Sequence, residues 1–220
     1  MAITATSGGA SAAITPNRPS WADMKKHYPD KSVATATLYD TKIGGKFVKL
    51  YDHPAYANTC AVRMSYALNR SGLKLGKAPT KGGSIDAPDK YLYWIRVSDL
   101  KKELESRFKG ADEELALPLV TSAMIAEKPK AEAAFKDRVA KARAFLADKI
   151  GKRHGIVVFE VSGWGDASGH FTLWDGAAQQ LAYATDHDDD SNNKYYFWLT
   201  ILTDDKKIIQ TTKVKFWELK

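Results

Sequence analysis

The sequence predicts an α+β fold, in which helices pack on one face of a mostly antiparallel sheet. Two observations carry this prediction. Segments with an apolar period of three to four residues lie in the first two thirds of the 220-residue chain. From residue 155 onward, short runs rich in β-branched and aromatic residues are typical of strands. Helices followed by strands favour the α+β class, and we find no internal repeat.

The first residues differ in character from the rest of the chain. Residues 1–17 are small and polar, rich in Gly, Ala, Ser and Thr. Such a segment buries too little apolar area to offset the entropy of ordering. We therefore expect a flexible tail over residues 1–17 and a single domain over residues 18–220. A helix is expected just inside that domain, after Pro19 and Ser20.

The segment YANTCAVRMSYALNRSG, residues 56–72, contains the only cysteine of the chain. Its apolar residues recur at helical spacing: Ala61, Met64, Ala67 and Leu68. Asn58 and Thr59 are residue types that often precede a helix, and Gly72 is typical of a helix end. The pattern predicts a helix that begins at Cys60.

Residues 91–110 continue the pattern with a strand and a helix. YLYWIRV, residues 91–97, is dense in aromatic and β-branched residues and predicts a strand. Ser98 is expected to cap the following helix, whose apolar residues are four apart: Leu100, Leu104 and Phe108.

Residues 131–150 give the clearest helical pattern of the sequence. One face is apolar: Phe135, Val139, Ala142, Leu146 and Ile150. The preceding residues, 110–131, fit a surface insertion or short helices.

The C-terminal part predicts four strands. GIVVFEV (155–161) is a continuous apolar run typical of a buried strand. GHFTLW (169–174) alternates, with His170, Thr172 and Trp174 on one face and Phe171 and Leu173 on the other. KYYFWLTIL (194–202) and KVKFWEL (213–219) complete the set.

Composition narrows the function classes. The net charge of +7 favours anionic surroundings such as nucleic acid, cell wall or membrane surface. A single cysteine excludes an internal disulfide framework and a cysteine-based zinc site. The acidic run DHDDDSNN lacks the Gly and Glu of a calcium loop, so we expect no metal and no cofactor. No apolar run approaches the length of a membrane span, and the first residues do not resemble a Sec signal peptide.

Cys60 is a candidate nucleophile because of its place at a helix N-terminus. The unpaired N–H groups there carry about half a positive charge, which favours a thiolate and could hold an oxyanion. A nucleophilic cysteine also needs a histidine to take its proton. The alternative is a small buried cysteine with no catalytic role.

His170 is the best placed of the five histidines. It lies on a predicted strand beside Gly169, and its side chain points away from the apolar pair Phe171 and Leu173. The others fall in a surface helix, in loops or in an acidic run: His27, His53, His154 and His187. A third residue could orient the imidazole. Asp175 belongs to an Asp-Gly turn that needs no catalytic explanation, so the order of residues favours Asp186.

Four segments resemble one known family: NRPSW (17–21), NTCAVRMSYALNRSG (58–72), DKYLYWIRVSDL (89–100) and GIVVFEVSGWGDASGHFTLWDG (155–176). They are similar to the fourth family of type VI secretion amidase effectors, bacterial toxins related to the NlpC-type papain-like cysteine peptidases. The resemblance runs in the same order from residue 17 to the C-terminus. It implies a papain-like fold with the nucleophile at a helix N-terminus.

The resemblance also implies a function and a set of catalytic residues. The expected reaction is hydrolysis of the γ-D-glutamyl–meso-diaminopimelate bond of peptidoglycan. Cys60 matches the nucleophile and His170 the general base. Asp186 is the best match for the residue that orients His170, and Asp188 stays possible, because the segment LAYATDHDDDSNN lacks the cysteines of the relatives and is longer.

Delivery and partners follow from the same resemblance. The expected partners are the peptidoglycan peptide, a type VI secretion apparatus that delivers the protein into a target periplasm, and a cognate immunity protein. No nucleic-acid or membrane partner is expected. Two alternatives stay open: a basic, non-catalytic binding module for nucleic acid or wall polymer, and a Cys–His enzyme for another acyl substrate.

Overall fold

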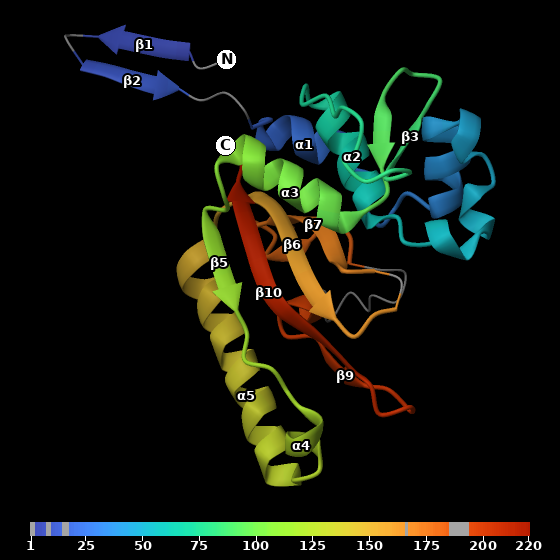
Figure 1. Cartoon of the computed structure of the whole chain (residues 1–220). Coiled ribbons are helices and arrows are strands. Elements are labelled where there is room, and N and C mark those ends of the chain that lie inside the picture. The colour runs from blue at the N-terminus through green and yellow to red at the C-terminus, as the bar shows by residue number, and fades with distance from the viewer. Residues whose placement is uncertain (1–2, 8–9, 15–17, 166, 185–193) are drawn as a thin grey trace.

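The computed structural model describes residues 3–7, 10–14, 18–165, 167–184 and 194–220 (Figure 1). The α-helices in these ranges are α1 (Trp21–His27), α2 (Cys60–Arg70), α3 (Val97–Phe108), α4 (Ser122–Ile125) and α5 (Lys128–Phe145). Shorter helical turns are η1 (Thr37–Ile43), η2 (Gly45–Phe47), η3 (Leu50–Asp52), η4 (Pro54–Tyr56), η5 (Leu146–Ile150) and η7 (Tyr195–Phe197).

The described strands form one main sheet and two small pairs. The strands are β1 (Ile3–Ser7), β2 (Ala10–Ile14), β3 (Ser84–Asp86), β4 (Leu92–Trp94), β5 (Glu113–Ala116), β6 (Gly155–Ser162), β7 (Gly169–Asp175), β8 (Gln180–Leu181), β9 (Thr200–Leu202) and β10 (Ile208–Glu218). The six-stranded sheet has the order β5-β10-β6-β7-β8, with β9 also paired to β10. All of these described pairings are antiparallel, which confirms the predicted α+β fold.

Helices cover both faces of this sheet, so the prediction of helices on one face was wrong. The first face packs against α1, α2 and α3 and includes Ile156, Val158 and Phe171. The opposite face packs against α5, η5 and η7 and includes Val157 and Phe159. Strand β6 is apolar on both sides, and an uncovered side would leave large side chains in water.

Helix α2 lies between the sheet and a third cluster. Met64 and Leu68 pack on the sheet side, whereas Val62 packs with Tyr39 and Phe47 from η1 and η2. Nearly the whole helix is therefore buried. Its fixed position determines where Cys60, its first residue, lies relative to β7.

Several elements agree with the sequence prediction. Helix α1 starts after Ser20, whose hydroxyl accepts the N–H of Asp23 at 3.1 Å. Helix α2 begins at Cys60 as expected. Strands β6 and β7 include the predicted segments 155–161 and 169–174, and β10 includes all of the predicted segment 213–219 except Leu219.

Other elements differ from the prediction. Residues 194–202 do not form one strand: η7 comes first and only β9 is extended. Tyr196 and Phe197 are both buried in the same cluster, whereas a strand would send these neighbours to opposite faces. Helix α3 begins at Val97, so Ser98 lies inside its first turn and is not its cap.

The segment before the long helix also differs from expectation. Residues 110–131 contain α4, as expected, but also β5, which pairs with the edge of β10. Phe135, expected on the apolar face of the long helix, is 44% exposed. Its half of α5 extends past β5 and β6 (Figure 1).

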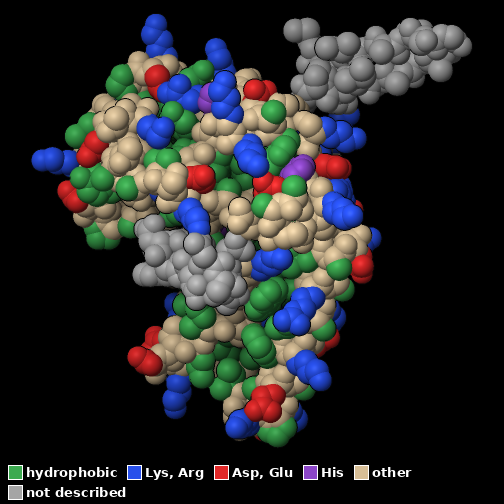
Figure 2. All heavy atoms as spheres, turned by 180° about the vertical axis from the view of Figure 1, so that it is seen from behind, with side chains coloured by type: hydrophobic (Ala, Val, Ile, Leu, Met, Phe, Trp, Pro, Cys, Tyr) green, Lys and Arg blue, Asp and Glu red, His purple; other side chains and the backbone are tan. Residues whose placement is uncertain are grey.

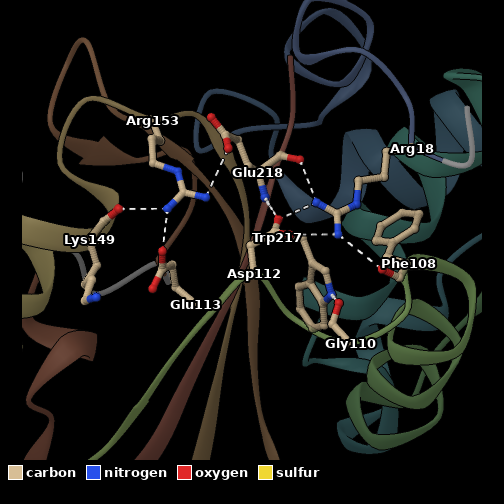
Figure 3. Close-up of polar contacts among 9 residues, drawn as sticks. All are labelled: Arg18, Phe108, Gly110, Asp112, Glu113, Lys149, Arg153, Trp217 and Glu218. Carbon is tan, nitrogen blue, oxygen red and sulfur yellow. Dashed lines mark hydrogen bonds and ion pairs between the residues drawn. The ribbon is translucent and has the colours of Figure 1, made fainter. Parts of the chain in front are cut away.

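Arg18 connects the start of the folded domain to later parts of the chain through hydrogen bonds (Figure 3). Its guanidinium donates to both carboxylate oxygens of Asp112 and to the carbonyls of Phe108 and Glu218. It also lies 5.1 Å from the centre of the Phe108 ring. These bonds join residue 18 to α3 and β10. The strands β1 and β2 precede this point as a hairpin, and the flexibility of residues 1–17 stays a prediction.

Charged side chains of both signs lie on one face of the molecule (Figure 2). On the face in Figure 2, Lys and Arg side chains are interspersed with Asp and Glu and do not form a single stripe. No helix within the described ranges is long and apolar enough to cross a membrane.

Candidate active site

Cys60 lies at the first position of α2, against strand β7. Its thiol contacts the backbone N–H of Phe171, the residue after His170. Burial is the strongest influence on the thiol and raises its pKa; the N–H groups of Phe171, Ala61 and Cys60, and the charge of Arg63, act in the opposite direction. The thiol is therefore protonated in the resting protein at neutral pH.

His170 lies near the start of β7, with its ring enclosed by aromatic side chains. It stacks on Tyr196 with ring centres 4.5 Å apart and is only 3% exposed. Burial lowers its pKa to about 4, while a hydrogen bond to the Tyr183 backbone partly opposes that shift. The imidazole is therefore neutral at pH 7.

The Tyr183 carbonyl fixes the tautomer of this imidazole. Nε2 of His170 lies 2.9 Å from that carbonyl oxygen. Because a carbonyl can only accept, Nε2 carries the proton and donates it. Nδ1 of the neutral ring then has the free lone pair that a general base needs.

Both candidate residues line one cavity of about 390 Å³. Its walls include Trp164, Tyr195 and Ile201. A second hollow, of about 640 Å³, also reaches Cys60 and extends to Arg96 and Ser98 at the start of α3. Cys60 thus borders both hollows.

The other described histidines have different roles. His154 stacks on Trp21, with ring centres 4.6 Å apart, and accepts the N–H of Gly176. Nδ1 of His53 accepts the N–H of Ala55 in η4. Neither residue, nor His27, lines the cavity around Cys60. His187 lies outside the described residues.

Asp175 has a structural role, as its Asp-Gly turn suggests. Its carboxylate accepts hydrogen bonds from the N–H groups of Ala177 and Ala178, and it forms an ion pair with Lys25 at 2.7 Å. Asp186 and Asp188 lie outside the described residues, so their role stays a prediction.

Three residues of the site did not emerge from the sequence. Tyr183 orients His170 through its backbone, which no side-chain pattern can reveal. Tyr196 stacks on His170 from a segment predicted as a strand. Arg63 is buried in a helix beside Cys60, where an apolar residue would be expected. An arginine on the apolar face of a helix was the one available signal.

No group of three or more His, Cys, Asp or Glu residues in the described ranges could hold a metal ion. Among the described residues, this site offers a thiol, a neutral imidazole and backbone N–H groups.

Comparison with known proteins identifies relatives of this fold. The family model described as type VI secretion system (T6SS), amidase effector protein 4 (Tae4) matches residues 56–217. Among curated proteins, none matches the sequence.

Solved structures of effectors are similar over most of their length. The Tae4–Tai4 effector–immunity complex from Enterobacter cloacae matches with a TM-score of 0.60 and 23% identity, over 92% of this chain and 99% of that chain. The effector Tae4 from the same organism gives 0.59 and 24%, over 92% and 98%. The Tae4–Tai4 complex from Salmonella Typhimurium gives 0.59 and 21%, over 92% and 99%.

Proposed function

The chain belongs to the Tae4 family of type VI secretion amidase effectors, and from that premise we propose that it is a papain-like cysteine amidase that cuts peptidoglycan stem peptides. The bond is the γ-D-glutamyl–meso-diaminopimelate bond. Cys60 is the nucleophile, His170 the general base, and Asp186 helps to orient His170.

One observation carries the proposal: Cys60 and His170 line the same cavity, and the bond from Nε2 to Tyr183 leaves Nδ1 available as a base. The thiol is at a helix N-terminus, where the N–H groups of Cys60 and Ala61 lie beside the sulfur. These are the parts that acyl transfer through a cysteine requires.

The reaction begins with neutral groups, since burial favours both the protonated thiol and the unprotonated imidazole. Nδ1 of His170 takes the Sγ proton as the sulfur attacks the γ-carbonyl carbon. The resulting oxyanion is held by the N–H of Cys60. The imidazolium then gives its proton to the nitrogen of diaminopimelate, which leaves as a free amine.

A water molecule completes the cycle. His170 takes one of its protons as the oxygen attacks the thioester, and the Cys60 sulfur leaves and regains a proton. The products are a glutamate with a free γ-carboxylate and a diaminopimelate with a free amine. The two hollows at Cys60 suit a substrate that extends on both sides of the cut bond.

Delivery and inhibition complete the proposal. A type VI apparatus carries the protein into the periplasm of a target cell, where its substrate lies. The Tae4 structures from Enterobacter cloacae and Salmonella Typhimurium include complexes with Tai4 immunity proteins. We expect a cognate immunity protein to bind this chain as well.

Mass spectrometry of digested peptidoglycan tests the proposal. We expect wild-type protein to release fragments with a free diaminopimelate amine, and Cys60→Ala and His170→Asn to release none. Asp186→Asn should lower the rate about 100-fold or more if it orients the imidazole. Asp188→Asn and Asp175→Asn are the matched controls and should retain at least about a third of the rate, a change of under 1 kcal/mol.

Undigested peptidoglycan with every variant, wild type included, would overturn the choice of substrate. Wall binding without hydrolysis would instead support the non-catalytic module. Full activity of Asp186→Asn would leave the Tyr183 carbonyl as the group that orients His170.

A further inference from the structure

A buried arginine lies one helical turn after Cys60. Arg63 is 1% exposed, and its guanidinium donates to four oxygens. The acceptors are Thr59 Oγ1 at 2.9 Å and the carbonyls of Pro29 at 2.9 Å, Asp30 at 3.0 Å and Val33 at 2.9 Å. All four are neutral, so these bonds satisfy the donors without cancelling the charge.

Burying the charge of Arg63 in this way costs free energy, which suggests that the charge has a role. Removing a guanidinium from water carries a desolvation penalty that neutral acceptors only partly offset. An apolar side chain of similar volume in the same helix would avoid that penalty. The surroundings of Arg63 indicate what the charge does there.

Arg63 contacts a residue on each side of the Cys60–His170 pair. On the cysteine side it bonds Thr59, the residue immediately before Cys60. On the histidine side its guanidinium lies 4.1 Å from the centre of the Tyr183 ring. The carbonyl of that tyrosine accepts the Nε2 proton of His170. These two residues also contact each other, because the Tyr183 hydroxyl lies 3.4 Å from Thr59 Oγ1.

The charge of Arg63 also acts on both groups. It lowers the pKa of the Cys60 thiol and the pKa of His170, in each case after burial as the larger influence. Among the described residues, Tyr28 from the end of α1 and Tyr39 from η1 are further titratable groups that face this region. Burial raises the pKa of both phenols above their ordinary value, so both stay neutral at working pH.

We propose that Arg63 is a positioning residue of the amidase site. It holds Thr59 and Tyr183 in place, and through them it fixes the thiol of Cys60 relative to the imidazole of His170. It also supplies a buried positive charge beside the thiolate that forms during the reaction. The catalytic part of this inference rests on the proposed function. The contacts of Arg63 with Thr59 and Tyr183, here called the clamp, and its positive charge both act on the Cys60 thiol. Their effect on the reactivity of that thiol can be measured without peptidoglycan.

The test compares Arg63→Met, which removes charge and clamp, with Arg63→Lys, which keeps the charge but not the forked bonds. The rate of Cys60 alkylation by iodoacetamide is measured against pH, together with the pH profile of kcat/KM for hydrolysis. For Arg63→Met we expect the alkylation inflection to move up by about one pH unit. The acidic limb of kcat/KM should also move up, and kcat should fall about 10- to 100-fold with little change in KM. Arg63→Lys should keep both inflections and lose kcat only.

Arg138 provides the matched control. It is also fully buried, and it too donates to neutral oxygens, among them the carbonyls of Leu199 and Thr211, on the α5 side of the sheet. Arg138→Met should lower the melting temperature to a similar degree and leave the alkylation profile of Cys60 unchanged.

The direction of the shifts separates a charge effect from loosened packing. Loss of a positive charge raises the pKa of thiol and imidazole together, whereas entry of water lowers that of the thiol and raises that of the imidazole. An unchanged or lowered alkylation inflection in folded Arg63→Met would overturn the inference. A raised inflection in a protein that cuts no peptidoglycan would leave the inference on Arg63 standing and reject the proposed function.

Discussion

At the level of single residues, the site combines a protonated thiol with a neutral imidazole, because burial acts on both. Burial disfavours charge and so moves the two pKa values apart, which makes a resting thiolate–imidazolium pair unfavourable. The proton therefore moves during attack. His170 also affects folding, since an imidazole that is buried in its neutral form resists protonation.

Acid should destabilise the protein through His170. The pKa of His170 falls from an ordinary 6.5 to about 4 in the folded protein. Between these values the unfolded chain binds a proton that the folded chain does not. The contribution of His170 to the free energy of unfolding is therefore complete above pH 6.5. It decreases as the pH falls, by about 3 kcal/mol near pH 4. Urea unfolding of wild type and His170→Asn at pH 7, 5.5 and 4.5 measures it.

Between pH 7 and pH 4.5, His170→Asn should lose less stability than the wild type, because it lacks the one proton that the unfolded wild-type chain binds at His170. Cys60→Ala is the control, because it keeps His170 and should follow the wild-type slope. Equal slopes for wild type and His170→Asn would show that His170 titrates normally in the folded state.

At the level of elements, the site depends on how closely β7 approaches β6. Gly169 begins β7 and pairs with Glu160, and His170 follows directly. A Cβ placed on Gly169 would lie 2.2 Å from the carbonyl oxygen of Phe159. The missing side chain of Gly169 therefore allows the two strands to meet closely.

Gly169→Ala should therefore displace the start of β7 together with His170. We expect a loss of about 1–3 kcal/mol in the free energy of unfolding and a larger fall in kcat than that stability loss explains. Gly76→Ala is the control: a Cβ there meets no atom within 4 Å, so its stability and activity should stay near wild type. Wild-type kcat for Gly169→Ala would show that the position of His170 does not depend on this close approach.

The sequence predicted elements best where one physical signal dominates. Helix α2 and strands β6, β7 and β10 have clear periodicity or continuous apolar runs, and they formed where expected. Cys60 and His170 line one cavity, and their catalytic roles stay a prediction. The turn η7 was missed, because a run of four aromatic residues from Tyr195 onward fits a strand until tertiary packing buries two neighbours in one layer.

At the level of the whole molecule, the sheet is a shared wall between two cores. Helices α1 to α3 pack on one face and α5 on the other, and the cavity around Cys60 has walls from both cores, with Tyr183 in the first and Tyr196 in the second. The long-range bonds that close this arrangement, such as those of Arg63 to residues 29–33, leave no local pattern in the sequence. Such bonds could not be predicted without the fold.

Deletion of residues 1–17 tests the predicted domain boundary. The bonds of Arg18 to Asp112 and to α3 and β10 join the domain from residue 18 onward, so the shortened chain should keep its melting temperature within about 2 °C and its full activity. Arg18→Ala in the full chain should instead lose about 1 kcal/mol, because it removes the ion pair with Asp112, whose carboxylate then keeps the N–H of Glu218 as a partner. A large loss of stability on deletion would place residues 1–17 within the folded domain.

The most direct test of the Cys60–His170 account is acid-quenched mass spectrometry of the protein during turnover of an L-Ala-γ-D-Glu-meso-diaminopimelate peptide. We expect an early mass increase equal to an L-Ala-γ-D-Glu acyl group, located on the peptide that contains Cys60, and neither adduct nor product with Cys60→Ala. Undiminished hydrolysis by Cys60→Ala, with no adduct on the wild type, would contradict it.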